Sequence, residues 1–254
     1  MNRFFTGETP EDGKIRITGS DVNHIKNVLR MQPGDRILVN NGHETEYSGR
    51  ILEINKEDVL VEITDERPTD TELPVKIYLY QGLPKKDKME LIVQKSVELG
   101  AYAIVPVEMK RCVVKLEDAK KEEKKLERWQ TIAKSASEQS TRGMIPEVCH
   151  AKKYKEAMEE ALKAGDVIIP YENAEGITAL KNVLASLKEK VKDNKSDEKP
   201  VLSVFIGPEG GFDEAEIEYA LERGAKTVSL GKRILRTETA GLTTLSIIMY
   251  ELES

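Results

Sequence analysis

The sequence predicts an α/β protein in which a small β-barrel precedes a larger domain built on a largely parallel sheet. Residues 1–66 hold short strand-like runs separated by turn signals such as Gln-Pro-Gly-Asp at 32–35. From Val75 onward, apolar strand-like runs alternate with helical patterns, which is typical of a parallel sheet covered on both faces. Residues 67–74, with two prolines and several acids, separate the two patterns and are expected to form a linker.

The first 66 residues contain four candidate strands and one candidate helix. The helix is expected at residues 21–29, where apolar residues recur on one helical face and Ser20 or Asp21 can cap the first turn. The strands are expected to close into a small barrel. The apolar positions of the helix are Val22, Ile25, Val28 and Leu29, and the candidate strands are residues 14–17, 36–39, 44–54 and 59–63.

The second part of the chain contains five candidate strands with helices between them. Gly100 and Gly224 each follow a helical pattern and are expected to end it. The candidate strands are residues 75–81, 103–107, 167–171, 201–206 and 227–230, and the candidate helices are residues 86–99, a charged stretch near 117–138, residues 213–223 and an apolar helix through residue 250.

Composition limits the class of protein. The chain has 254 residues, no apolar run long enough to cross a bilayer, no secretory signal at its start and only two cysteines, Cys112 and Cys149. A cytoplasmic protein with reduced thiols is expected. The net charge of -6 argues against a protein that binds nucleic acid over its whole surface, so any RNA contact must be a local patch.

A glycine-rich turn follows the apolar run at 201–206 and reads Gly-Pro-Glu-Gly-Gly at residues 207–211. Ligands of open α/β sheets bind outside the carboxyl ends of strands, and glycines let the backbone approach a ligand closely. The alternative is a tight turn into a helix, with Asp213 and Glu216 as a capping pair. The glycine spacing matches neither the dinucleotide-binding motif nor the P-loop.

Three further segments combine cations with polar residues. Three cations, Lys232, Arg233 and Arg236, fall in one short loop, which indicates an anionic ligand or simply solvated charges. The same loop leads into a helix for which Thr237 is a candidate N-cap. Elsewhere, the segments at 82–90 and 135–143 could contact phosphates and a base edge, although a charged helix face explains their lysines equally well.

These motifs resemble one known family along nearly the whole chain. Ile-Gly-Pro-Glu-Gly-Gly at 206–211, followed by Leu-Gly-x-Arg-Ile-Leu-Arg-Thr-Glu-Thr at 230–239, is similar to the bacterial 16S rRNA uracil-N3 methyltransferases of the SPOUT superfamily. Arg3 and the His24…Val28-Leu29-Arg30 segment resemble the PUA-like RNA-binding barrel of that family. The resemblance implies a PUA-like barrel at residues 1–70 and a SPOUT methyltransferase domain with a deep C-terminal trefoil knot at residues 74–254.

The resemblance also implies a cofactor and partners. S-adenosylmethionine is expected to bind in the knot without a metal, and the substrate is expected to be 16S rRNA or the small ribosomal subunit during its maturation. The histidines His24, His43 and His150 lack metal-ligand spacing. A homodimer is expected through the apolar stripe of the last helix. The expected cofactor contacts are Leu83, Gly207, Glu209, Gly210, Gly211, Leu230, Gly231, Ile234, Leu235 and Thr239, and the stripe is Leu242, Leu245, Met249 and Leu252.

Methylation of a pyrimidine N3 needs no covalent enzyme nucleophile, so Cys112 is interpreted as a packing residue. Arg236 is the candidate cation that stabilises charge on the uracil carbonyls, and Glu138 is the candidate general base. Two alternatives stay open: a non-catalytic RNA-binding ribosome-assembly protein, and a knot methyltransferase that acts on another RNA site. The candidate RNA-binding residues are Arg3, His24, Arg30, Lys85, Arg111 and Arg142.

Overall fold

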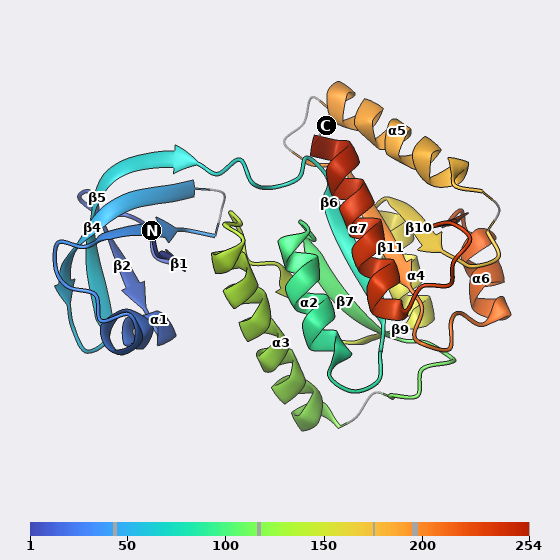
Figure 1. Cartoon of the computed structure of the whole chain (residues 1–254), viewed down its shortest axis with the longest axis horizontal. Coiled ribbons are helices and arrows are strands. Elements are labelled where there is room, and N and C mark those ends of the chain that lie inside the picture. The colour runs from blue at the N-terminus through green and yellow to red at the C-terminus, as the bar shows by residue number, and fades with distance from the viewer. Residues whose placement is uncertain (43–44, 116–117, 175, 195–197, 254) are drawn as a thin grey trace. The chain divides into compact units, whose positions relative to one another are not determined.

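The computed structural model describes residues 1–42, 45–115, 118–174, 176–194 and 198–253, and it divides the chain into two compact units. The first unit comprises Met1–Glu72 together with Ser137–Ile145, and the second comprises Leu73–Ala136 with Pro146–Ser254. Helix α3 (Ala119–Gln139) therefore begins in the second unit and ends in the first (Figure 1). None of the helices in the described ranges combines the length and apolarity needed to cross a membrane.

The first unit is a curled five-stranded sheet in the order β1-β3-β4-β5-β2. Strands β1 and β3 run parallel and the other pairs run antiparallel. The side chain of Thr6, just after β1, donates a 2.7 Å hydrogen bond to Arg16 O in β2, and this bond links the two edge strands. The strands are β1 (Arg3–Phe5), β2 (Lys14–Thr18), β3 (Arg36–Asn40), β4 (Thr45–Ile54) and β5 (Asp58–Pro68).

The helix predicted at residues 21–29 of this unit is not a regular α-helix. It consists of one α-helical turn, α1 (Ser20–Asn23), followed by a wider π-helical turn, η1 (His24–Val28), in which Leu29 N bonds to His24 O. The wider turn rotates later residues off the apolar face. The side chains of Val28 and Leu29, expected to be buried with Val22 and Ile25, are accordingly exposed.

The predicted linker is partly wrong, because β5 continues through Pro68. Arg67 lies opposite Glu46 of β4, and its guanidinium donates two hydrogen bonds, of 3.0 and 2.6 Å, to the buried Glu46 carboxylate. This charge-assisted pairing extends the sheet into residues whose prolines and acids suggested a loop.

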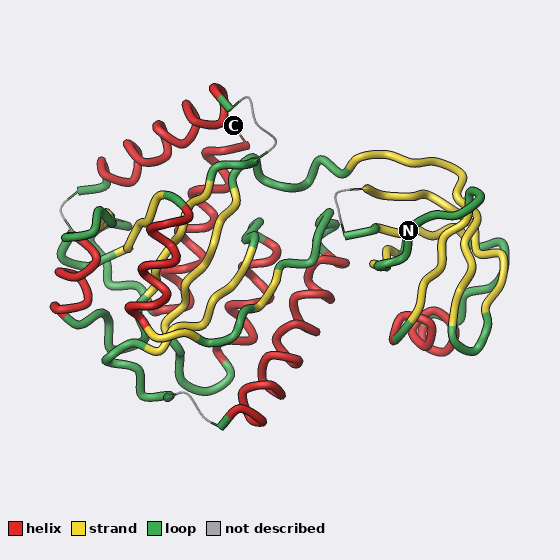
Figure 2. The backbone as a smooth tube through the Cα atoms, turned by 180° about the vertical axis from the view of Figure 1, so that it is seen from behind, coloured by secondary structure: helices red, strands yellow, loops and turns green. Residues whose placement is uncertain are grey.

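The second unit is a parallel sheet in the order β12-β10-β11-β6-β7-β8, with β9 pairing beside β8 on β7. Figures 1 and 2 show helices on both of its faces. Helices α2, α5 and α7 pack together on one face, and α4 and α6 cover the other. The strands are β6 (Lys76–Gly82), β7 (Ala103–Glu108), β8 (Glu147–Val148), β9 (Lys152–Lys153), β10 (Asp166–Pro170), β11 (Val201–Ile206) and β12 (Lys226–Val228); the helices are α2 (Lys88–Glu98), α4 (Tyr154–Ala164), α5 (Thr178–Asp193), α6 (Glu214–Leu221) and α7 (Thr237–Glu253).

Aromatic packing fixes the central strands beneath the carboxyl edge of the sheet. Phe205, fully buried in β11, stacks on Tyr80 of β6 with ring centroids 4.4 Å apart and planes at 1°. Tyr154 of α4 meets Phe205 edge-on at 6.0 Å. Each such pair adds about 0.5–1.5 kcal/mol beyond the burial of its area, so the strand that leads into the glycine turn is held firmly.

The start of α7 returns to the middle of the sheet. β12 lies at the edge, beyond β10, yet the Thr237 hydroxyl donates a 2.6 Å hydrogen bond to Gly207 O and accepts one of 2.8 Å from the buried Gln81 side chain. The segment at 229–236 therefore crosses the end of β10 to reach β11 and β6, as the expected knot requires. Thr237 is the first residue of the helix, and its hydroxyl bonds to the sheet rather than capping α7.

Candidate active site

A cavity of about 460 Å³ lies where the glycine turn, the end of β10 and the loop before α7 meet. A smaller cavity of about 80 Å³ adjoins it and shares part of its lining. Both lie at the carboxyl edge of the parallel sheet, which is where ligands of such sheets bind. The larger cavity is lined by Lys88, Pro170, Glu172, Ile206 to Phe212, Ile234 to Thr237 and Ala240.

Each glycine of the turn is required by the protein itself. A Cβ at Gly207 would lie 3.1 Å from the buried Phe212 ring, and a Cβ at Gly210 would lie 3.1 Å from the Cβ of Arg111. Gly211 has φ +68°, a conformation that side chains disfavour. A side chain at Gly210 would therefore meet the neighbouring loop at Arg111, and the expected contact of Gly210 with the cofactor stays a prediction.

The predicted capping pair is also present. The Asp213 side chain accepts from Ala215 N, and the Glu216 side chain accepts from Asp213 N at 3.0 Å, so the two residues form a capping box at the start of α6. Glu216 also accepts a 2.8 Å hydrogen bond from Lys110 N. The turn is thus both a structural helix start and one wall of a cavity.

Carboxylates and one lysine join the segment after β6 to this wall. Lys88 Nζ lies 3.2 Å from Glu209 and 3.0 Å from Glu238, and Glu209 also accepts a 3.1 Å hydrogen bond from Lys85 N. Burial opposes ionisation of Glu209, but hydrogen bonds from its own backbone and Lys85 N, together with Lys88, outweigh burial and lower its pKa. The pKa of Glu238 is lowered in the same way, against burial, by its own backbone N–H and Lys88.

Most of the expected cofactor residues lie at these two cavities. Thr239 is exposed on α7 and lines neither of them. Leu83 is buried, donates its N–H to Val107 O, and lines a different cavity of the second unit. Gly207, Glu209, Gly210, Gly211, Ile234 and Leu235 line the larger cavity, and Leu230 and Gly231 line the smaller one.

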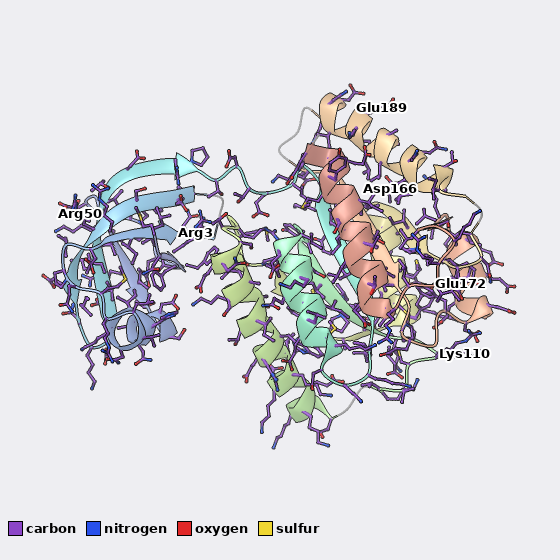
Figure 3. The ribbon with its side chains drawn as sticks, in the orientation of Figure 1. Arg3, Arg50, Lys110, Asp166, Glu172 and Glu189 are labelled. Carbon is purple, nitrogen blue, oxygen red and sulfur yellow. The ribbon has the colours of Figure 1, made fainter. Side chains whose placement is uncertain are left out.

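The sequence interpretation missed the wall formed by Pro170, Tyr171 and Glu172. These residues end or directly follow β10, which neighbours β11 in the sheet. The rule that places ligands at the carboxyl ends of parallel strands would have identified them. Glu172 is the only one of the three that adds a carboxylate to the cavity, and it is labelled in Figure 3.

The two candidate catalytic residues belong to different units. Arg236 is exposed and lines the larger cavity of the second unit. Glu138 is half-buried in the segment Ser137–Ile145 and belongs to the first unit. Cys112 is buried, and burial raises the pKa of its thiol, which agrees with a packing role.

Arg3 and Arg142, two candidate RNA contacts, are buried in the first unit. The side chain of Arg3 forms an ion pair with Glu46 and donates a 2.8 Å hydrogen bond to Arg142 O (Figure 3). Arg142 donates from Nε and Nη2 to the two oxygens of Glu72, at 2.8 and 2.6 Å. In this structure the two guanidinium groups hold residues 137–145 against the barrel, so neither is placed as an open phosphate contact.

The other candidate RNA-binding residues are exposed. In the first unit, Arg30 has φ +53° and His24 packs edge-on against Phe4 with centroids 5.9 Å apart. In the second unit, Lys85 adjoins the glycine turn and Arg111 Nη1 donates a 3.3 Å hydrogen bond to Gly210 O. The described residues contain no group of three potential metal ligands, and His43 lies outside them.

Comparison with known proteins gives the family. An RNA methyltransferase domain model matches residues 71–249, and an RNA methyltransferase PUA domain model matches residues 17–64. Ribosomal RNA small subunit methyltransferase E from Bacillus subtilis is 38% identical, with 100% of this chain and 98% of the relative covered.

Two solved structures extend the likeness to the fold. The methyltransferase E of Neisseria gonorrhoeae bound to S-adenosyl methionine has a TM-score of 0.82 and 34% identity, covering 98% of this chain and 97% of that one. A Legionella pneumophila methyltransferase in complex with the same cofactor has a TM-score of 0.80 and 31% identity, covering 98% and 96%. The expected α/β fold, with a PUA-like domain before an RNA methyltransferase domain, is confirmed. The chain belongs to the RNA methyltransferase family that includes the ribosomal RNA small subunit methyltransferases E.

Proposed function

We propose that this chain transfers the methyl group of S-adenosylmethionine to N3 of a uridine in 16S RNA of the small ribosomal subunit. The observation that carries the proposal is the cavity of about 460 Å³ at the carboxyl edge of the sheet, in a chain 34% identical to a methyltransferase E bound to that cofactor. The name of the Bacillus subtilis relative supports small-subunit RNA as the substrate.

The cavity suits the cofactor in shape and charge. The turn at 207–211, in which three of the five residues are glycines, lines the cavity together with Ile234 and Leu235, and Pro170 adds an apolar surface. The carboxylates of Glu172 and Glu209 complement a cationic sulfonium and ammonium. When bound, S-adenosylmethionine supplies an electrophilic methyl carbon, and the chain's own residues orient that carbon.

Arg236 is the proposed catalytic cation. Its guanidinium lines the cofactor cavity and can donate hydrogen bonds to the uracil carbonyl oxygens as the N3–H proton leaves. Glu138 is the proposed acceptor of that proton. Removal of that proton would leave a lone pair on N3, the nucleophile for the methyl carbon that bound S-adenosylmethionine would supply. No covalent bond to Cys112 is needed, and its burial agrees with that.

The barrel at residues 1–70 is proposed to hold the RNA, and residues 74–254 to hold the cofactor. His24 and Arg30 are the exposed candidates on the barrel, and Lys85 and Arg111 are those near the glycine turn. Phosphate contacts by such residues position RNA without reading its sequence. Arg3 and Arg142 are assigned instead to the structure of the first unit.

A homodimer through α7 is also proposed, with a revised surface. Leu245 and Ile248 are fully buried within their own unit, so they are unavailable to a partner. Leu242 and Met249 are half-exposed and Tyr250 is 71% exposed, which leaves apolar surface for a second copy. Sedimentation of wild type and of a Met249→Glu, Tyr250→Glu variant tests this, and a wild-type monomer at micromolar concentration would contradict it.

Nucleoside mass spectrometry tests the proposed reaction. Small subunits from a deletion strain are expected to lack N3-methyluridine in 16S RNA and to regain it when incubated with purified protein and S-adenosylmethionine. The matched control is the same incubation with the Arg236→Met variant. A methyl group on another base atom, or on ribose, would refute the assigned position.

A further inference from the structure

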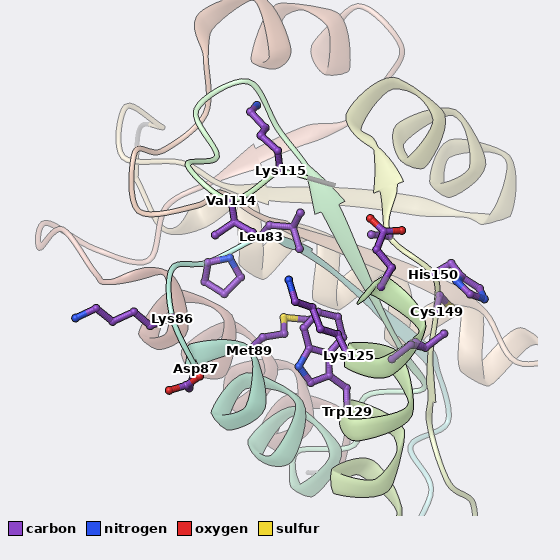
Figure 4. A pocket seen from close by; sticks show the side chains of 14 residues that line it. Leu83, Lys86, Asp87, Met89, Val114, Lys115, Lys125, Trp129, Cys149 and His150 are labelled. Atoms are coloured by element: carbon purple, nitrogen blue, oxygen red, sulfur yellow. The ribbon is translucent and has the colours of Figure 1, made fainter. Parts of the chain in front are cut away.

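A separate cavity of about 280 Å³ lies in the second unit, away from the glycine turn (Figure 4). Its walls come from the segment after β6, the segment after β7, helix α3 and the residues that follow β8. The volume lies near the lower end of small-ligand sites, about 300 Å³, which suits one nucleotide better than a larger ligand. The residues that matter here are Leu83, Met89, Val114, Lys125 and Trp129.

An aromatic ring and a cation meet in this cavity. Trp129 is the single tryptophan of a chain with only 5% aromatic residues, and it is half-exposed where it lines the cavity. Figure 4 shows Trp129 grouped with Met89 and Lys125, while the side chains of Lys86 and Asp87 point away. An unstacked RNA base stacks on such a ring, and an adjacent cation meets its phosphate.

Leu83 and Val114 add to the apolar part of the lining, as do Pro84, Leu126 and Ala151. A base buries its faces against apolar and aromatic surface and keeps its phosphate near the opening. Lys115 also lines the cavity, and its Nζ lies 3.3 Å from Glu108. Lys125 is the lysine that Figure 4 shows grouped with Trp129, so its removal is expected to affect phosphate binding most.

The segment at 83–89 separates this cavity from the proposed cofactor site. Leu83 and Met89 line the cavity of about 280 Å³ that contains Trp129, whereas Lys88 lines the cavity of about 460 Å³ at the glycine turn. The bond from Lys85 N to Glu209 and the ion pairs of Lys88 hold the segment against the glycine turn. A nucleotide bound beside Trp129 would thus lie one chain segment away from the methyl donor.

We infer that this cavity binds one unstacked nucleotide of the substrate RNA, flanking the uridine that is methylated. The inference rests on the proposed function, because it takes the RNA to be a substrate held near the cofactor. A flanking nucleotide fits better than the target, since the segment at 83–89 stands between this cavity and the cofactor cavity.

Trp129 reports on its own cavity, because the chain has one indole, whose emission can be excited selectively over that of its eight tyrosines. Titration with uridine 5′-monophosphate and with a short single-stranded oligouridylate, at saturating S-adenosylmethionine, is expected to change its emission saturably. Binding of the oligonucleotide by anisotropy without any change in Trp129 emission would overturn the inference.

Variants of α3 separate this subsite from general charge effects. Lys125→Ala is expected to weaken oligouridylate binding several-fold and to lower the salt slope by about 0.7, the amount for one phosphate contact on a single strand. Lys124→Ala is the matched control, because Lys124 is an exposed neighbour on the same helix that does not line the cavity. Equal effects of the two substitutions would refute a specific site.

Trp129→Leu is expected to weaken oligonucleotide binding roughly 5- to 150-fold, the range that about 1–3 kcal/mol of base stacking represents. S-adenosylmethionine affinity should stay unchanged. If Trp129→Leu does not fold, the comparison of Lys125→Ala with Lys124→Ala decides whether the cavity binds a nucleotide.

Methyl-transfer kinetics distinguish failure of the nucleotide subsite from failure of the proposed function. A raised KM for RNA in Lys125→Ala, with an unchanged kcat, supports the flanking subsite. Normal methyl transfer with an unchanged KM in both variants overturns the subsite and leaves the proposed function standing. Saturable quenching by oligouridylate in a wild-type protein that transfers no methyl group to small subunits supports the nucleotide site and refutes the proposed function.

Discussion

Replacing Glu72 with alanine is expected to destabilise the first unit by about 3–5 kcal/mol, because it leaves the Arg142 guanidinium buried without its counter-charge. The Glu72 carboxylate accepts three hydrogen bonds, two from Arg142 at 2.8 and 2.6 Å and one of 2.8 Å from Gly143 N. The two charged side chains are only 3% and 7% exposed. At roughly 2–4 °C per kcal/mol for a chain of this size, the melting temperature should fall by about 6–20 °C.

Two further variants isolate the buried pair. Arg16→Ala removes an ion pair with Asp58 in the same unit, but the Arg16 side chain is 53% exposed, so a loss of at most about 1 kcal/mol is expected. The double variant Glu72→Leu, Arg142→Met removes both charges and keeps apolar volume. It is expected to recover most of the stability lost in Glu72→Ala, since no unpaired charge remains buried.

Urea unfolding measures these differences, and hydrogen exchange locates them. Faster exchange in Glu72→Ala is expected at residues 137–145, because the carboxylate of Glu72 bonds to the Arg142 side chain and to Gly143 N. Calorimetry is expected to show unchanged S-adenosylmethionine affinity. The reasoning is refuted if Arg142→Ala unfolds within 1 kcal/mol of wild type while its RNA affinity and salt slope both fall. That pattern would mean that Arg142 contacts phosphate.

Three other predictions concern the second unit. Arg236→Met should lower kcat roughly 10²- to 10³-fold with cofactor affinity retained, as measured by single-turnover methyl transfer and calorimetry, whereas an equal loss of affinity would make Arg236 a cofactor ligand. Lys88→Met should raise the lowered pKa values of Glu209 and Glu238. A carboxylate whose pKa is lowered by folding stabilises the fold above its unfolded pKa of about 4.5. The variant's melting temperature should therefore differ most from that of wild type above this pH, and the difference should shrink as the pH falls. Burial raises the pKa of Cys149 from 9.0 to about 11, so in a Cys112→Ala background the rate of alkylation should climb through pH 11, and a midpoint at 9 would contradict this.

The parallel sheet could be predicted because its central strands are long apolar runs. The expected strand at 201–206 has the observed bounds of β11, and the others differ by one or two residues at an end. β8 and β9 have two residues each, too few for any periodicity, and β1 has three. The π-helical turn at 24–28 could not be predicted from the sequence either, because a single wider turn leaves the apolar spacing almost unchanged.

The glycine turn shows what a local motif leaves undecided. Its sequence allowed a capped helix start or a ligand cradle, and the structure has the capping box and the cavity together. The reason for each glycine depends on residues far along the chain, such as Arg111 for Gly210, at a sequence separation that no spacing rule covers. Glu172 was missed because it carries no glycine or charge pattern, only its place after a parallel strand.

The partners of Arg3 and Arg142 likewise lie far along the chain. Arg3 bonds to the carbonyl of a residue 139 positions away, and Arg142 pairs with a carboxylate 70 positions away, so neither partner was apparent locally. Their pairing has a consequence for the proposed reaction, because it makes residues 137–145, with Glu138, part of the barrel unit. Arg236 lines the larger cavity of the other unit, the proposed cofactor site. The proposed proton acceptor therefore belongs to the unit that is proposed to hold the RNA, and the proposed cation to the unit that is proposed to hold the cofactor. On this proposal, loosening the Glu72–Arg142 pair should slow proton removal while leaving cofactor binding intact.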